Sequence, residues 1–261
     1  MIKKTFHTLL MPLLLPLVGV MPVSVCAQGA KIEQSGQIRD RNMRLSAGGV
    51  LYNDGWAASL QMLRQDKRRG LELRIQEYIH PKEQKQINKE YLTLFDKEKV
   101  TPFYYKKQHN VYTLALSYVQ EYVMYSGGNF SVFNRNTAGV HLNLSKPVYY
   151  RVIYAYPDSA GRYDVRTEPI RDDNLDRTGS AKSILGKEPV YRNLDKMTVS
   201  AGISGTAALG MEIAVSSSLS TQLLLGGLVG VNSSRLVSLR DYPRQLFYVS
   251  GWVSGSIVLR L

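Results

Sequence analysis

The fold is decided by one stretch of the 261-residue chain, VSAGISGTAALGMEIAV at positions 199–215. Its odd-numbered positions, from Val199 to Val215, are apolar or glycine, while the even-numbered positions hold small or polar residues. Successive side chains of a β-strand point to opposite faces, so this pattern predicts a long strand with one apolar and one narrow polar face. A helix would not keep a period of two over this length.

The same alternation recurs along the chain after residue 40. We expect the strand near residues 138–145, the fifth along the chain, to continue past Pro147 to Tyr156 with a bulge, because proline cannot donate a hydrogen bond to a sheet. Asn53, Asp54 and Gly55 form a tight turn, since these residues tolerate a positive φ. With 199–215, the chain has eight predicted strands, the others near residues 43–51, 56–62, 71–75, 110–119, 138–145, 219–231 and 247–261.

The connections between these strands broadly alternate between short and long. Two long loops are predicted, at about residues 81–109 and 157–197, and a shorter connection runs from Gln120 to Thr137. Short turns at one end and long loops at the other are typical of an outer-membrane barrel. We interpret the basic and aromatic segment Lys97–Lys107 as part of a surface loop.

The N-terminus has the pattern of a secretory signal. Lys3 and Lys4 precede an apolar stretch that ends in small residues before Gln28, so we expect a signal peptide at 1–27 and a barrel domain at 28–261. Cys26 is the single cysteine and is an alternative lipidation site, disfavoured by the valine before it. Residues 1–27 hold two of the 33 basic and none of the 21 acidic residues, so cleavage lowers the formal net charge from +12 to +10.

The polar face of the strands separates a soluble barrel from a transmembrane one. A soluble barrel turns its polar face to water and needs many Lys and Glu there, whereas a small membrane barrel fills its lumen with small residues and a few paired charges. Here the face is mostly Ser, Gly, Thr and Ala, and the lysines lie in the connections. The sequence therefore predicts an all-β fold, a transmembrane antiparallel β-barrel of eight strands with short periplasmic turns and long extracellular loops.

Two sets of residues follow from that prediction. The few charges on the polar face are expected to form a lumen ion network with a structural role, and these are Arg44, Glu72, Arg74, Glu212 and Arg260. Aromatic residues near strand ends are expected to form interfacial girdles on the outside, and these are Tyr52, Trp56, Tyr112, Tyr118, Tyr149, Tyr150 and Tyr248.

Several short motifs together resemble a known family. They are the signal sequence, the Arg44–Gly55 hairpin, His80-Pro81-Lys82-Glu83, Lys146-Pro147-Val148-Tyr149-Tyr150 and a C-terminal strand that would close the barrel. This set is similar to a family of small outer-membrane β-barrel proteins of Bacteroidota, and it spans nearly the whole mature chain. The resemblance implies the fold and the compartment and no catalytic residues. The terminal Leu261 departs from the pattern, since outer-membrane barrels usually end in an aromatic residue.

Catalytic and metal chemistry find little support in the sequence. A hydrolase would need a serine beside His80, His109 or His141, and none has a serine two residues away on the same strand face. A weak candidate for Ca²⁺ is the cluster Asp172, Asn174 and Asp176, but glycine and glutamate are missing at the sixth and twelfth places of an EF-hand loop starting at Asp172. We therefore predict no enzyme activity, no metal site and no cofactor.

The expected role is structural or interactive. The candidates are an accessory to outer-membrane biogenesis or secretion and a surface adhesin. The alternatives are an outer-membrane lipid A acyl hydrolase and a soluble periplasmic lipocalin-like carrier. We expect the mature protein in the outer membrane of a Gram-negative bacterium, in contact with outer-membrane lipid and lipopolysaccharide and with other outer-membrane proteins. Nucleic acid is not an expected partner, because the chain is exported.

Overall fold

A computed structural model describes residues 43–92, 100–154, 164–169, 181–189, 191–240, 242–244 and 246–261. The predicted signal peptide and the acidic cluster Asp172, Asn174 and Asp176 lie outside these residues. The helical segments in the described part are 3-10 turns, namely η2 (Lys89–Leu92), η4 (Ala181–Ser183) and η5 (Leu194–Lys196). No helix in the described ranges is long and apolar enough to cross a membrane.

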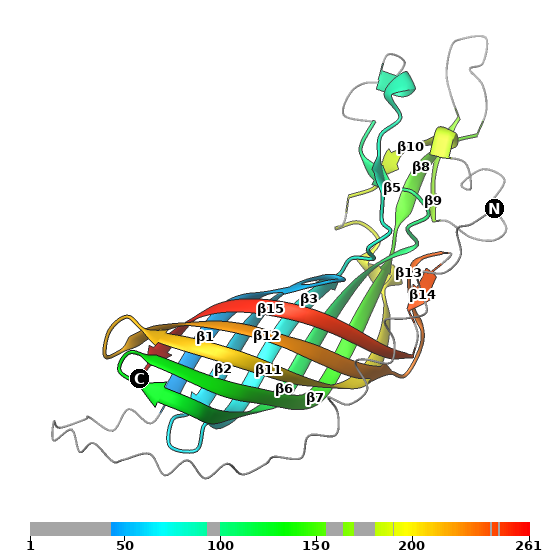
Figure 1. The fold of residues 1–261 in the computed structure, drawn as a ribbon. Coiled ribbons are helices and arrows are strands. Elements are labelled where there is room, and N and C mark those ends of the chain that lie inside the picture. Colours follow the sequence, from blue (N-terminus) through cyan, green and yellow to red (C-terminus); the bar gives the residue numbers. More distant parts are fainter. Residues whose placement is uncertain are drawn as a thin grey trace, which may run out of the picture. The chain divides into compact units, whose positions relative to one another are not determined.

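Eight strands close into an antiparallel barrel (Figure 1). Each strand pairs with the next along the chain, and the first and last close the wall with Arg44 opposite Arg260. This topology confirms the predicted fold class. The strands are β1 (Met43–Tyr52), β2 (Gly55–Arg64), β3 (Arg69–Tyr78), β6 (His109–Gly127), β7 (Phe130–Pro147), β11 (Thr198–Ala214), β12 (Leu219–Asn232) and β15 (Phe247–Arg260).

The two faces of the barrel wall have opposite polarity. Large apolar side chains point outward on every side, and Val140, Leu225 and Val249 are 60%, 69% and 64% exposed. Small polar side chains such as Ser46, Thr113 and Ser254 alternate with them and are buried inside. The strict alternation of the sequence therefore sorts apolar residues to the outside and polar residues to the lumen, as predicted.

The two ends of the barrel differ in their connections. At one end, which we call the turn end, the strands are joined by residues 65–68, 128–129 and 215–218. At the other, the loop end, they are joined by residues 53–54, 79–108, 148–197 and 233–246. Gly128 has φ +55° in the two-residue turn, a conformation that glycine adopts without strain. The two long loops lie at one end, as the sequence predicted.

The connection predicted from Gln120 to Thr137 is wrong. β6 runs to Gly127 and β7 starts at Phe130, so nearly all of that segment is strand. The alternation is interrupted there because the pairing shifts register between Val123 and Tyr125, a β-bulge that places consecutive apolar residues on one side. Every turn-end connection is therefore short.

The predicted continuation of the fifth strand past Pro147 is also wrong. β7 ends at Pro147, and Val148 separates it from β8 (Tyr149–Ile153), which leaves the barrel. β8 pairs instead with β9 (Val165–Pro169) and β10 (Ile184–Lys187) in a separate three-stranded sheet. Proline has no N–H for the ladder, so it marks the end of the wall rather than a bulge in it.

The loops contain further sheets of their own. Two separate strand pairs lie at the loop end together with the three-stranded sheet of β8, β9 and β10 (Figure 1). They are β4 (Lys85–Gln86) with β5 (Phe103–Tyr104), and β13 (Leu236–Leu239) with β14 (Tyr242–Arg244). We call these the loop-end sheets. They bury an apolar cluster of Phe103, Val148, Tyr150, Val152 and Ile184. In its described part, residues 100–107, the segment Lys97–Lys107 is therefore not simply a surface loop, since Phe103 and Lys107 are buried.

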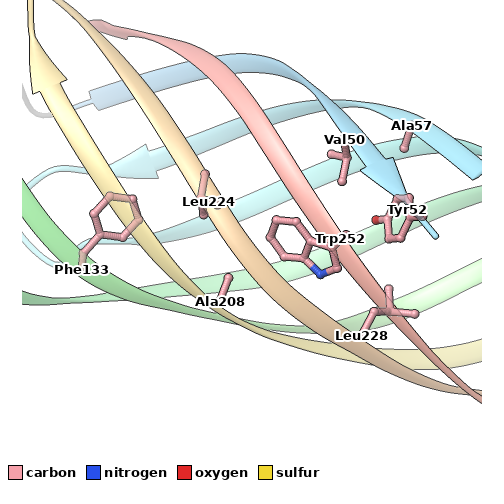
Figure 2. Packing of buried hydrophobic residues seen from close by; sticks show 8 residues of the cluster. All are labelled: Val50, Tyr52, Ala57, Phe133, Ala208, Leu224, Leu228 and Trp252. Atoms are coloured by element: carbon pink, nitrogen blue, oxygen red, sulfur yellow. The ribbon is translucent and has the colours of Figure 1, made fainter.

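The lumen also contains an apolar cluster that the sequence analysis missed (Figure 2). Trp252 and Tyr52 point into the barrel and pack with smaller side chains; the full set is Val50, Tyr52, Ala57, Phe133, Ala208, Leu224, Leu228 and Trp252. An eight-stranded barrel is just wide enough for side chains to fill it, and bulky residues here contribute to that filling.

The predicted aromatic girdle is only partly correct. Trp56 and Tyr118 lie on the outward face, each 47% exposed, and Tyr112 shares their parity on β6. Tyr52 points inward, and Tyr248 packs against the lumen cluster. Tyr149 and Tyr150 belong to β8 in the loop-end sheets. Strand parity decides each case, because one step along a strand moves a side chain to the other face.

Candidate functional site

A buried ion network lies in the lumen at the turn end. The Glu212 carboxylate accepts hydrogen bonds from Arg44 at 2.6 Å, Arg260 at 2.8 Å and Ser220 at 2.6 Å. Arg44 also donates to Glu121 at 3.1 Å, so one guanidinium on β1 joins carboxylates on β11 and β6. Both carboxylates are nearly inaccessible, which makes their arginine partners necessary to compensate for lost hydration.

The network includes two charged strand residues that the sequence analysis missed. Glu121 on β6 and Arg135 on β7 form an ion pair, and Arg135 also donates to Gln222 at 2.7 Å. Arg68 in the turn approaches Glu121 at 3.5 Å. Both missed residues fall in the segment that was predicted as a connection. The sequence did carry a signal for Glu121. Ser117 points into the lumen, and every second residue after it, as far as Glu121, lies on the same face of the strand.

Two of the predicted charges form a separate group. Arg74 pairs with Glu72 on its own strand and donates to the Tyr52 hydroxyl at 2.7 Å. The structure thus brings Arg44, Glu212 and Arg260 together and places Glu72 and Arg74 in a second ion pair. Both groups are buried inside the barrel, and the contacts of Arg44 link β1 to β6 and β11 across the lumen.

The histidines contact amides and carbonyls. In the lumen, a ring nitrogen of His141 lies 2.8 Å from the side-chain oxygen of Asn232, which also accepts from Asn143. His109 contacts the Val237 carbonyl at 2.9 Å, and His80 accepts from the Lys82 backbone N–H. Partial burial lowers the pKa of His80 below its ordinary value. No hydroxyl is among these ring contacts of the described residues.

A second buried group holds the loops together at the loop end. We call it the loop-end hub, and its members are Glu83, Lys107, Tyr150 and Ser238. Lys107 pairs with Glu83 at 2.6 Å, and Ser238 donates to the same carboxylate at 3.0 Å. The Tyr150 hydroxyl donates to the Lys107 carbonyl at 2.5 Å. The hub therefore joins the loops 79–108, 148–197 and 233–246.

Burial fixes the chemistry of the hub. The Glu83 and Lys107 side chains are 2% and 5% exposed, so each neutralises the other away from water. Burial also raises the pKa of the Tyr150 hydroxyl, which remains protonated and keeps its role as a donor. Sequence reasoning missed this hub, because its members lie far apart in the chain and carry no local pattern.

Replacing Glu83 by leucine is expected to loosen the loops. Lys107 would remain buried without a counter-charge, which costs about 3–5 kcal/mol for a broken buried pair. We expect proteinase K to cut the loops at least tenfold faster while the barrel stays intact on a gel. Asp195→Asn is the control, since Asp195 and Lys196 form an exposed pair worth little. Equal cleavage of both variants would contradict a stabilising hub.

Among the described residues, no group of three or more His, Cys, Asp or Glu side chains could hold a metal ion. The weak Ca²⁺ candidate lies outside the described residues and stays a prediction.

Comparison with solved structures finds similar β-barrel proteins, including the following two. The chain resembles the crystal structure of Neisserial surface protein A (NspA) with a TM-score of 0.38, at 7% identity over 84% of this chain and 96% of that one. It also resembles the N-terminal β-barrel domain of Pseudomonas aeruginosa OprF with a TM-score of 0.32, at 10% identity over 83% of this chain and 96% of that one. No family model and no curated protein sequence matches the chain.

Proposed function

We propose that the protein is an outer-membrane β-barrel of a Gram-negative bacterium that carries its loop-end sheets outside the cell for interaction with a partner. The observation that carries this proposal is the polarity of the barrel wall. An exposed apolar surface of this extent, with the polar residues inside, is what a barrel needs in lipid. In water the same surface would promote association.

The lumen supports a structural rather than a transport role. Side chains from several strands meet across it in two ion-paired groups and one apolar cluster. A barrel of eight strands has an interior that its own side chains fill, so a solute pore is not expected. The barrel then serves as an anchor, and specificity must come from the loops.

The loop-end hub supports interaction as the role of the loops. A buried ion pair and an apolar cluster give the described parts of these loops a defined surface. Pre-ordered loops lose less entropy on binding than flexible ones, which favours recognition of a partner. The partners we propose are lipopolysaccharide and other outer-membrane proteins, with roles in surface adhesion or as an accessory to outer-membrane biogenesis or secretion.

The two alternatives have less support. A soluble lipocalin-like carrier would bury its apolar residues inside the barrel, the reverse of the observed arrangement. A lipid A acyl hydrolase would need a serine within hydrogen-bond reach of a histidine, and His109 and His141 instead contact a carbonyl and an amide oxygen. An unchanged lipid A mass profile in a deletion strain is the result expected for a non-enzyme.

Cell fractionation tests the proposed location. We expect the mature protein in the detergent-resistant outer-membrane fraction, and we expect it to migrate faster on a gel when it is not boiled, because a folded barrel resists the detergent. Recovery in the soluble periplasmic fraction would contradict the proposal. The role is tested by crosslinking in intact outer membranes, where shortening residues 148–197 should remove captured partners without changing membrane insertion.

A further inference from the structure

The loop-end sheets contain a pocket of about 330 Å³ with an uncompensated positive charge. Lys85 and Lys187 line it together with Thr101, Tyr104 and Glu188. The Glu188 carboxylate is already engaged, since Arg192 donates to it at 3.0 Å and the Arg151 guanidinium lies 3.7 Å away. Neither lysine has a carboxylate partner among the described residues, so the wall of the pocket carries net positive charge.

Further lysines lie close to this wall. Lys107 and Lys187 share the Tyr104 ring, at 5.1 and 5.5 Å from its centroid, a contact that attracts ammonium groups. Lys107 is balanced by Glu83. Burial, with the charges of Lys107 and Lys85, lowers the pKa of Lys187 below its ordinary value. Lys187 therefore lies in a position that disfavours its charge in the absence of an anion.

The surroundings of Lys146 are a second observation that points to a ligand. It is 4% exposed, it repels Lys187 electrostatically, and no carboxylate pairs with it in the described part of the chain. Every other buried cation there has a carboxylate partner; these are Arg44, Arg74, Lys107 and Arg135. The Lys146 side chain is thus largely covered and has no counter-charge among the described residues, and a bound anion would supply one.

We propose that this pocket binds a phosphate group carried by a sugar, with Lys85 and Lys187 as direct ligands and Lys146 as a supporting charge. Phosphate fits because it carries up to two negative charges, and lysine binds it as a point charge. The pocket is larger than a phosphate ion and falls in the size range of small-molecule sites, which leaves room for a sugar ring. A free phosphosugar and a phosphorylated lipopolysaccharide headgroup share this chemistry.

The binding test uses the purified full chain in non-ionic detergent micelles, so its result does not depend on the location of the protein in the cell. Titration calorimetry with glucose 6-phosphate and with inorganic phosphate should show saturable binding that weakens with added salt, whereas glucose should not bind. Lys187→Gln is expected to weaken binding at least tenfold. Lys196→Gln, an exposed lysine in the same loop region, should stay within twofold.

Lys146→Met separates a binding role from a folding role. If Lys146 supports an anion, this variant should bind the phosphate probe several-fold more weakly while its melting temperature is unchanged or raised. A lowered melting temperature with unchanged binding would overturn its assignment. Absence of saturable phosphate binding, or an equal loss in Lys187→Gln and Lys196→Gln, would overturn the site itself.

The ligand source is decided by a second pair of titrations with detergent-dispersed lipopolysaccharide, before and after phosphatase treatment. Binding that falls after treatment identifies the lipid-linked phosphate as the ligand. Binding confined to glucose 6-phosphate identifies a soluble phosphosugar. Either result supports the phosphate site, and only the first ties it to the proposed contact with lipopolysaccharide.

Discussion

Replacing Glu212 by leucine is expected to lower the free energy of unfolding by about 3–5 kcal/mol, the cost of breaking a buried ion pair. Glu212 accepts four hydrogen bonds, from Arg44, Arg260, Ser220 and Gln222. Leucine supplies no acceptor, so Arg260 loses its carboxylate and Arg44 keeps only Glu121. Water cannot easily replace these bonds, because the network lies inside a filled lumen.

The measurement is urea unfolding in micelles or vesicles, followed by the fluorescence of Trp56 and Trp252. Asp66→Asn is a matched control at the same end of the barrel, because Asp66 and Arg64 form a solvent-exposed pair. Its effect should stay below about 1 kcal/mol. Glu212→Gln adds a further check, since an amide retains an acceptor and should lose less than leucine. Equal stability of the leucine and wild-type proteins would show that the network is not needed.

The lumen ion network also shows which contacts the sequence alone could predict. Arg44, Glu212 and Arg260 could be placed in one lumen because strict alternation fixes which face each residue occupies. Glu121 and Arg135 could not, because the bulge near Val123 breaks the alternation and made their segment resemble a loop. Strand length is set by pairing with neighbours, and pairing is a property of the closed wall rather than of one segment.

The loop-end sites were harder to predict for a different reason. Glu83, Lys107 and Ser238 come from separate parts of the chain, and only the folded loops bring them together. Lys107 and Lys187 stand in basic segments that resemble ordinary solvated loops. Their burial depends on Phe103, Tyr150 and the strand pairs around them, which no local periodicity reveals. Lysine count alone therefore could not separate paired, unpaired and solvent-exposed charges.

Leu225→Arg tests the polarity of the wall, on which the proposed membrane location depends. Leu225 is 69% exposed and stands at the middle of the 14-residue strand β12. If that surface faces lipid, arginine must enter the hydrocarbon core, and we expect a loss of about 2–4 kcal/mol in stability. In a soluble barrel the same change would add a charge to a wet surface and cost no more than about 0.5 kcal/mol.

The prediction is measured by folding the protein into phosphatidylcholine vesicles and titrating with urea. Tyr191→Arg is the control, because Tyr191 is 72% exposed in the loop region and its arginine would remain in water. Leu225→Ala separates the cost of charge from the loss of apolar contact, and arginine should be the more damaging of the two. Similar small effects of Leu225→Arg and Tyr191→Arg would mean that the outer face is not in lipid. A large loss for Leu225→Arg alone follows only if the apolar side chains of the wall face hydrocarbon.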